Sequence, residues 1–322
     1  MEMPLRLRQA VDAALQGVAV AELATASKAL SQRYRNEVRD GRLHISDERL
    51  ALAYIATRMP ATYAAIHASL AAAAERAPNF APRTALDVGA GPGTVLWAAS
   101  AVWPALASVT LLEASPSIRA IGEKLAGASS LAHIDWRHVD VTRDGERLAP
   151  ADLVTLAYVL DELSSEQRDR LVDRLWSLTS GMLVIVEPGT STGWQRILDA
   201  RARLIASGAS ILAPCPHGLA CPIIAPDWCH FSARLARSRV HRLAKEAEAP
   251  WEDEKFIYLA ASRLPADPPG ARVLAPTETA TGRVRLKLCR QDGVVESRLV
   301  TRREGGAFKS ARRSDWGDAF DF

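Results

Sequence analysis

The chain has 322 residues, of which 48% are hydrophobic and 24% charged, with 40 basic and 37 acidic side chains. This composition is typical of a soluble globular protein and excludes a disordered chain, a collagen, a coiled coil and a disulfide-stapled miniprotein. No run of about 18 uncharged apolar residues is present, which excludes a membrane-spanning helix.

The first 80 residues predict a helical region. Apolar residues recur at helical spacing around Val11 and Leu50, and residues 61–74 continue this pattern until the break before Pro78. Ser46 is the expected N-cap of the helix that carries Leu50. The first residues lack a basic stretch followed by an apolar one, so we expect no signal peptide, a cytoplasmic location and cysteines outside disulfides.

From residue 83 the sequence alternates between short apolar runs and helical segments. Strands are predicted at residues 84–88, 109–113, 134–139, 153–159, 182–186 and 255–262, and helices at 93–101, 115–125 and 164–178. Strand–helix repeats of this kind predict a parallel sheet that is covered by helices on both faces.

A glycine-rich turn, DVGAGPG at residues 87–93, separates the first predicted strand from its helix. Glycines allow the backbone to turn tightly and to approach a ligand closely, and the following helix N-terminus favours a carboxylate or phosphate. Glu113 ends the next predicted strand, twenty residues after Gly93, where a carboxylate suits the ribose hydroxyls of an adenosine group.

The spacing of the glycines distinguishes two cofactors. A dinucleotide-binding turn has the pattern G-x-G-x-x-G, whereas this chain has G-x-G-x-G preceded by Asp87. That pattern resembles the first motif of the class I S-adenosylmethionine (SAM)-dependent methyltransferases, so we predict an α/β fold with their Rossmann-like sheet. A tight turn without a ligand is the alternative. The predicted cofactor-binding residues are Asp87, Gly89, Gly91, Gly93, Glu113 and Asp140.

Two carboxylates follow the fourth predicted strand, at the usual catalytic edge of such a sheet. Asp161 and Glu162 are candidates for a general base, although acidic residues also commonly open a helix on the surface. No Asn/Asp-Pro-Pro-aromatic loop and no Pro-Cys nucleophile stands at this edge. The sequence therefore leaves the catalytic residues unassigned beyond these two.

The four cysteines indicate a shared inorganic centre. Cys215, Cys221 and Cys229 lie within fifteen residues in a proline-rich segment, and Cys289 follows near the carboxyl end. Structural zinc usually takes ligands separated by two to four residues, and these spacings are wider. Prolines follow Cys215 and Cys221, as one follows the last cysteine in some ferredoxin motifs. A 4Fe–4S cluster and zinc both remain open, with His217 and His230 as spare ligands.

Basic residues concentrate late in the chain. Residues 234–245 hold four Arg, one Lys and no acid, and residues 283–313 hold ten Lys or Arg and three acids. We expect a basic helix at residues 231–245 and a strand with one basic face at 283–288, paired with 294–300 across a turn at Gly293. Such patches bind phosphates or form a solvated surface.

Together these motifs resemble one family, the small-ribosomal-subunit methyltransferase-like proteins of bacteria and mitochondria. The resemblance spans about residues 45–320 and rests on ordered segments at 87–93, 215–222, 228–231, 255–258, 272–274, 286–289 and 311–318. It implies a 4Fe–4S cluster on Cys215, Cys221, Cys229 and Cys289, and binding to small-subunit rRNA during ribosome assembly. The expected RNA contacts are Arg234, Arg237, Arg242, Arg283, Arg285, Lys287, Arg312 and Arg313.

The sequence thus predicts three regions: a helical region at residues 1–80, a methyltransferase-like domain at 81–264 with a cysteine-rich insertion at 210–230, and a basic β-rich region at 265–322. We expect a monomer that binds rRNA and the small ribosomal subunit and no membrane. Three functions compete: a SAM-dependent rRNA methyltransferase, a non-catalytic rRNA-binding assembly factor on the same fold, and a zinc-containing small-molecule methyltransferase.

Overall fold

The amino-terminal part of the protein is helical. The structure, a computed structural model, describes residues 1–36, 43–141 and 147–321. Its first helices are α1 (Leu5–Ala14), α2 (Val20–Arg35), α3 (Glu48–Thr57) and α4 (Met59–Arg76). The N-cap of α3 is Asp47, whose carboxylate accepts a hydrogen bond from the Leu50 backbone N–H at 2.9 Å. The expected cap at Ser46 was therefore one residue early.

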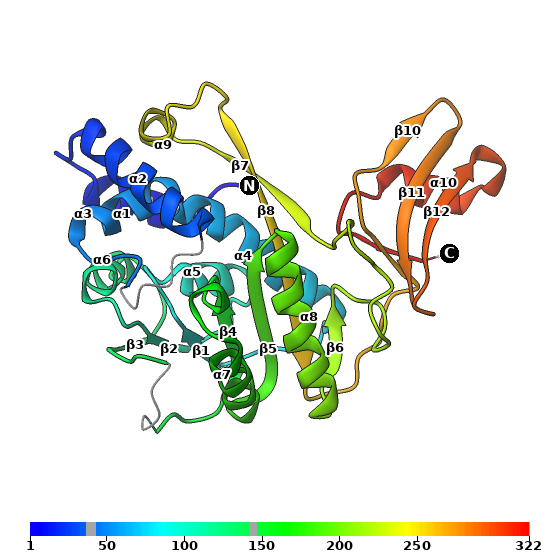
Figure 1. Ribbon diagram of the computed structural model, residues 1–322, viewed down its shortest axis with the longest axis horizontal. Coiled ribbons are helices and arrows are strands. Elements are labelled where there is room, and N and C mark those ends of the chain that lie inside the picture. The colour runs from blue at the N-terminus through cyan, green and yellow to red at the C-terminus, as the bar shows by residue number, and fades with distance from the viewer. Residues whose placement is uncertain (37–42, 142–146, 322) are drawn as a thin grey trace.

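An eight-stranded sheet forms the centre of the molecule (Figure 1). Its strands are β1 (Thr84–Val88), β2 (Ser108–Leu112), β3 (His133–Arg137), β4 (Ala151–Ala157), β5 (Thr179–Pro188), β6 (Ser210–Ala213), β7 (Phe231–Ala236) and β8 (Trp251–Ser262). The order is β3-β2-β1-β4-β5-β8-β6, with β7 paired to β8. Strands β1 to β5 are parallel, and β8 runs antiparallel to β5. The predicted α/β sheet of the methyltransferase type is confirmed at this level.

Helices cover both faces of the sheet, as the strand–helix alternation predicts. They are α5 (Thr94–Val102), α6 (Pro116–Ala126), α7 (Ser165–Ser177) and α8 (Ser191–Ala206). Helices α7 and α8 pack together on one face, and α4 packs against α5 on the other (Figure 1). The caps explain where they begin: Ser115 accepts from Ile118 N–H, and Ser164 and Gln167 form a capping box.

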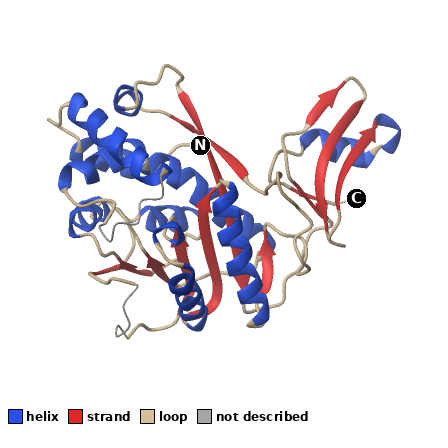
Figure 2. Cartoon of the chain, in the orientation of Figure 1, coloured by secondary structure: helices blue, strands red, loops and turns tan. Residues whose placement is uncertain are grey.

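The expected basic helix at residues 231–245 is wrong in its first half. Residues 231–236 form β7, and only α9 (Arg239–Ala244) is helical. Phe231, Ala233 and Leu235 are buried, with exposed or half-buried residues between them, which is the period of a strand. The two strands β7 and β8 extend beyond the sheet as a ribbon that ends in α9 (Figure 2). Pairing with β8 therefore outweighs the local helical pattern.

The carboxyl-terminal part forms a second, five-stranded sheet with its own core. Its elements are β9 (Ala271–Val273), β10 (Glu278–Ala280), β11 (Arg283–Arg290), β12 (Val295–Thr301), the 3-10 turn η2 (Arg302–Glu304), α10 (Gly306–Arg313) and β13 (Ala319–Phe320). Strands β11 and β12 form the predicted hairpin, and Gly293 has a φ of 79° at its turn. The division of the chain into separate domains at residues 80 and 264 stays a prediction.

None of the helices in the described parts of the chain combines the length and apolar character that a bilayer-spanning segment needs.

Candidate functional site

A cavity of about 990 Å³ opens at the carboxyl ends of the parallel strands. The loops that follow β1, β2, β3, β4 and β5 form its floor and sides. Ligands bind at this edge of open α/β sheets, because the strand ends and helix N-termini converge there. Four of the six predicted cofactor-binding residues line the cavity: Gly89, Gly91, Glu113 and Asp140.

The glycine turn after β1 has little room for side chains. Gly89 has a φ of 70°, and a Cβ on it would lie 2.4 Å from Val159 Cγ2. The backbone N–H groups of Gly89 and Ala90 both donate to Leu112 O at 2.9 Å, which ties the turn to the end of β2. Gly93 is not among the cavity residues; it takes the left-handed N-cap position of α5. The turn is thus fixed against β2 and β4, with its backbone facing the cavity.

Glu113 connects the two sides of the turn. Its carboxylate accepts from Gly91 N–H at 2.8 Å and from Ser115 N–H at 2.7 Å. Burial raises the pKa of Glu113, and these backbone donors oppose the rise. Glu113 therefore stands at the end of β2 where the sequence places it, in reach of any group that binds above Gly91.

Asp87 lies beneath the cavity and does not line it. Its side chain is buried, and Oδ1 accepts from Thr155 Oγ1 at 2.7 Å while Oδ2 has no partner. Burial raises the pKa of Asp87 to about 7. Its position makes it a support for the glycine turn rather than a direct ligand contact.

A buried ion pair holds the segment after β4. Glu187, at the end of β5, is fully buried and accepts from Leu160 N–H at 3.1 Å and from Arg196 Nε at 2.7 Å. Leu160 begins the 3-10 turn η1 (Leu160–Glu162), so Glu187 fixes the turn that carries both candidate acids. No local pattern in the sequence marks this pair.

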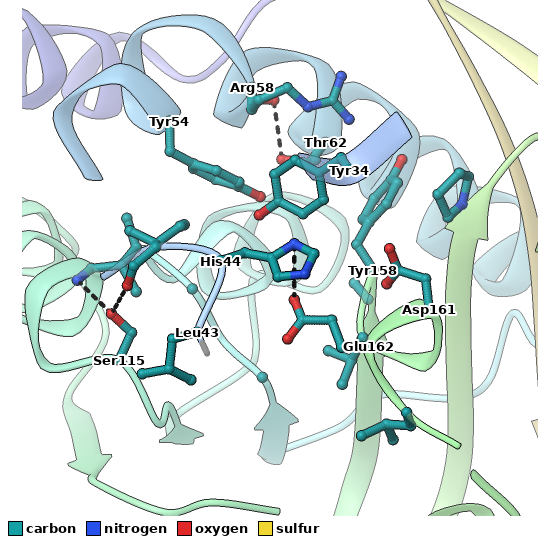
Figure 3. Close-up of a pocket in the computed structure, with 18 of the residues that line it drawn as sticks. Tyr34, Leu43, His44, Tyr54, Arg58, Thr62, Ser115, Tyr158, Asp161 and Glu162 are labelled. Carbon is teal, nitrogen blue, oxygen red and sulfur yellow. Dashed lines mark hydrogen bonds and ion pairs between the residues drawn. The ribbon is translucent and has the colours of Figure 1, made fainter. Parts of the chain in front are cut away.

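Asp161 and Glu162 both line the cavity, within the 3-10 turn that precedes α7. Asp161 is buried, and the Glu162 side chain is 35% exposed. Burial, and then the negative charge of Asp161, raise the pKa of Glu162 to about 8. His44 Nδ1 lies 3.9 Å from Glu162 Oε1 (Figure 3). The pair can hold or move a proton at the cavity wall.

Side chains of the amino-terminal helices form the roof of the cavity, which the sequence analysis missed. Tyr34 comes from α2, Tyr54 from α3 and Arg58 from the end of α3, and all three line the cavity above Glu162 (Figure 3). Tyr54 and Arg58 are four residues apart, so they share a helix face. The four-residue spacing predicts that both side chains lie on one helix face, but it does not predict which part of the protein that face contacts.

The four cysteines belong to two parts of the fold. Cys215, Cys221 and Cys229 lie in the loop between β6 and β7, and Cys289 lies on β11. Burial raises the pKa of the Cys229 thiol well above its ordinary value, and the charges of the other three cysteines add to the rise. The contact between Cys289 Sγ and His217 Nε2, at 3.4 Å, brings β11 against this loop.

Two buried arginines stand beside these thiols. Arg201 is 5% exposed and Arg272 2% exposed. Arg201 donates to His217 O at 2.6 Å and Arg272 to Pro214 O at 2.8 Å. Within the described residues neither guanidinium forms an ion pair with a carboxylate, and each keeps one buried nitrogen without a partner. Because buried charges require compensation, this environment suits an anionic four-thiolate centre.

The surroundings of the cysteines leave the type of inorganic centre open. Among the residues that the structure describes, no three His, Cys, Asp or Glu side chains are grouped to hold one metal. His217 Nε2 lies 3.4 Å from Cys289 Sγ, whereas His230 stacks on Trp228 at 5.2 Å between ring centres. Cluster binding and zinc binding alike stay predictions here.

Half of the predicted RNA contacts are engaged in ion pairs. Arg234 pairs with Asp253 at 2.7 Å, and Arg237 with Glu252 at 3.1 Å. Arg285 and Lys287 pair with Glu278 at 3.6 Å and Asp227 at 2.5 Å, respectively. The other four are exposed and have no carboxylate partner among the described residues; they are Arg242, Arg283, Arg312 and Arg313.

One protein family and several curated proteins are similar to this chain. The family model described as "Mitochondrial small ribosomal subunit Rsm22" matches residues 48–321. The Homo sapiens protein described as "Ribosome assembly protein METTL17, mitochondrial" is 30% identical over 292 residues, which cover 84% of this chain and 62% of that protein. The Rsm22-cox11 tandem protein 2 of Schizosaccharomyces pombe is 27% identical, over 84% of this chain and 43% of its own length. The chain thus spans about half the length of these curated relatives.

One solved structure among the similar ones is that of magnesium protoporphyrin IX methyltransferase from Synechocystis PCC 6803 with bound SAM. It superposes with a TM-score of 0.42 at 15% identity, covering 77% of this chain and 100% of that chain.

The relatives correct one prediction. A cytoplasmic location was expected from the first residues, and it is wrong, because the matching family and both curated relatives are described as mitochondrial. The predicted family is confirmed by the match over residues 48–321 and by the human relative. The chain belongs to the Rsm22 family of mitochondrial small-ribosomal-subunit proteins.

Proposed function

We propose that this protein binds SAM and an iron–sulfur cluster and acts on small-subunit rRNA during ribosome assembly. The observation that carries the proposal is the cavity at the strand ends, where Gly89, Gly91, Glu113 and Asp140 converge. The human relative is described as a ribosome assembly protein, which supports assembly as the process.

SAM fits the cavity by its chemistry. The Gly89–Gly91 backbone leaves an open floor, and the Glu113 carboxylate is suited to accept hydrogen bonds from two ribose hydroxyls. Asp140 lines the same cavity and would hold the adenine. When bound, SAM supplies a methyl group activated by its sulfonium sulfur. The residues of the chain hold and orient it, and the roof from α2 and α3 excludes water.

Glu162 is the residue best placed to handle the proton that a methyl acceptor releases. Its pKa of about 8 makes the ionised fraction of Glu162 basic enough to accept this proton near neutral pH, and His44 Nδ1 lies 3.9 Å from its carboxylate. A catalytic group works best when its pKa lies near the working pH. Asp161 raises the Glu162 pKa, and Glu187 positions the turn that carries both.

A non-catalytic assembly factor is the second candidate. It is favoured by the relative's description and by the lack of a known catalytic motif at residues 157–162. In this case the cavity would bind SAM for stability, and the exposed arginines of the carboxyl-terminal sheet and α10 would hold rRNA phosphates.

The cluster would be held by Cys215, Cys221, Cys229 and Cys289, with Arg201 and Arg272 balancing its negative charge. A thiolate-held cluster would join the loop after β6 to β11 and so connect the two sheets. Anaerobic purification, with an absorption spectrum and iron and sulfide counts, tests this part. Stoichiometric zinc in colourless protein would contradict it.

SAM binding and methyl transfer are tested on one set of variants. We expect Glu113→Ala to weaken SAM binding by about tenfold or more in calorimetry, since a charged acceptor is lost. The matched control Glu123→Ala, on the exposed part of α6, should bind normally.

Glu162→Gln should keep SAM binding but lose transfer to small-subunit rRNA. Wild-type protein that binds SAM, transfers no methyl and still supports assembly would favour the second candidate.

A further inference from the structure

The outward face of the β7–β8 ribbon carries a set of side chains that the proposed function has not used. We define the ribbon as residues 231–236 and 251–256, which pair in antiparallel register. Side chains alternate between its two faces. The inner face buries Phe231, Ala233, Leu235 and Phe256, whereas the outer face presents Arg234, Ala236, Trp251, Asp253 and Lys255.

Trp251 is the most unusual residue of this face. It is 49% exposed, and its register partner across the ribbon is Ala236, which is itself exposed. The small partner leaves the indole without a bulky cross-strand neighbour. Exposed tryptophans that stand on a rigid strand pair are suited to ring stacking.

Arg234 fixes one side of the indole. Its guanidinium carbon lies 5.7 Å from the centre of the Trp251 ring. Asp253 holds that guanidinium through two hydrogen bonds, of 2.7 and 2.8 Å. Arg234 is therefore already neutralised and oriented, and its role here is to support the ring rather than to bind a phosphate.

Further exposed cations lie on the ribbon and on α9. Arg239 and Arg242, on the helix that caps the ribbon, and Lys255 on β8 are exposed and have no carboxylate partner within the described part of the chain. The surface thus combines an aromatic platform with free positive charge. Single-stranded nucleic acids bind such surfaces, by stacking a base and placing phosphates on the cations.

The edge of the ribbon is closed to a peptide strand. Met1 N donates to Arg234 O at 2.6 Å, and Ala236 N donates to Met1 O at 3.3 Å. These bonds occupy backbone groups of β7 that an added strand would need. The free surface is therefore the face that carries Trp251.

This surface adjoins the cavity. Glu252, the residue after Trp251, lines the cavity, as does Lys245 at the end of α9. Consecutive strand residues point to opposite faces, so the ribbon separates the Trp251 surface from the cavity by its own thickness. Figure 1 shows the ribbon and α9 projecting above the amino-terminal helices.

We infer that Trp251 stacks on an unpaired base of single-stranded RNA, with Arg239, Arg242 and Lys255 binding the adjoining phosphates. The inference rests on the proposed association with rRNA. It adds a binding site, next to the cavity, for a single-stranded segment of that RNA.

The test uses the full chain and a labelled oligoadenylate RNA of about twelve nucleotides, with an RNA duplex of the same length for comparison. In fluorescence anisotropy Trp251→Ala should weaken binding of the single strand by about tenfold and leave duplex binding unchanged. Trp251→Phe, which keeps a ring, should retain most of the affinity. Leu264→Ala removes another exposed apolar side chain, 65% exposed, and should bind as the wild type does.

The cations are tested by salt dependence. The double variant Arg239→Gln/Arg242→Gln should reduce the slope of log affinity against log salt by about 1.4 for the single strand. Thermal midpoints equal to that of the wild type would show that weaker RNA binding by a variant does not result from a folding defect.

Unchanged oligoadenylate binding by Trp251→Ala would overturn the inference and leave the proposed function standing. Wild-type protein that binds neither RNA at low salt would overturn both. Equal losses for the single strand and the duplex would also overturn it, because stacking needs an unpaired base.

Discussion

At the residue scale, the cavity depends on groups whose environment is unusual for their type. Gly89 must lie against Val159, where a Cβ has no room, and Asp87 is a buried carboxyl with one unpaired oxygen. Neither residue needs to touch a ligand to matter. Each sets the shape of the turn on which SAM binding is proposed to depend.

Gly89→Ala tests the close approach. The new Cβ would lie 2.4 Å from Val159 Cγ2 at a φ of 70°, so we expect the free energy of unfolding to fall by about 2 kcal/mol or more. Gly208→Ala is the matched control, because Gly208 has a φ of 82° and nothing within 4 Å; it should lose only about 1 kcal/mol. Urea unfolding measures both. Equal losses would show that the contact with Val159 is unimportant.

The raised pKa of Asp87 predicts that the free energy of unfolding depends on pH. Its pKa rises from an ordinary 3.8 to about 7 on folding, so between these values the native state holds a proton that the unfolded chain has lost. The contribution is fully present below pH 3.8 and declines as pH rises toward 7. Asp87→Asn carries a permanently neutral group, so its free energy of unfolding should decline less over this window. Parallel curves for the two proteins would contradict the prediction.

At the scale of elements, the Glu187–Arg196 pair joins β5 to α8 and to the turn after β4. Both side chains are buried, with Arg196 only 4% exposed. Loss of one partner leaves the other charge buried without compensation. The pair therefore holds the turn that carries Asp161 and Glu162, although neither of its residues belongs to a motif of the sequence.

Arg196→Ala is expected to lower the free energy of unfolding by about 3–5 kcal/mol. Arg170→Ala breaks the exposed pair with Glu166 on α7, where the side chains are 63% and 81% exposed, and should cost less than about 0.5 kcal/mol. Urea unfolding of the two variants gives the comparison. A similar small loss for both would mean that Glu187 does not depend on Arg196.

At the scale of the whole molecule, the cysteine loop connects the two sheets. Arg272 on β9 donates to Pro214 O in the loop and to Gly317 O before β13, both at 2.8 Å. Cys289 on β11 contacts His217 from the loop. The position of the second sheet thus depends on the contacts that Arg272 and Cys289 make with this loop.

Cys289→Ser is expected to lose iron and sulfide and to loosen the second sheet. We expect faster amide hydrogen exchange in β9, β11 and β12 and unchanged exchange in β1 to β5, because each sheet has its own core. Ser297→Ala, on the exposed face of β12 opposite Lys287, serves as the control. Full retention of iron and sulfide by Cys289→Ser would contradict the assignment of this ligand.

The sequence by itself determined the strands of the parallel sheet, the glycine turn and the positions of α6 and α7, because these follow from patterns among residues near in the chain. Strand periodicity, helical periodicity and glycine spacing are local signals. The same locality explains the error at residues 231–236, where arginine spacing suggested a helix and pairing with β8 produced a strand. Glu113 and Gly91 were predictable for the same reason, since Glu113 directly follows β2 and Gly91 lies in the glycine turn after β1.

Only the tertiary structure decided what surrounds the cavity and the thiols. Tyr34, His44 and Arg58 reach the cavity because α2, α3 and α4 pack above the strand ends, and no local pattern encodes that packing. The carboxylate partners of Arg234 and Lys287 were equally hidden: Asp253 lies across a strand pair and Asp227 is 60 residues away in sequence. Burial and charge pairing between residues far apart in the chain depend on how the elements pack. Local patterns in the sequence therefore do not determine these parts of the site.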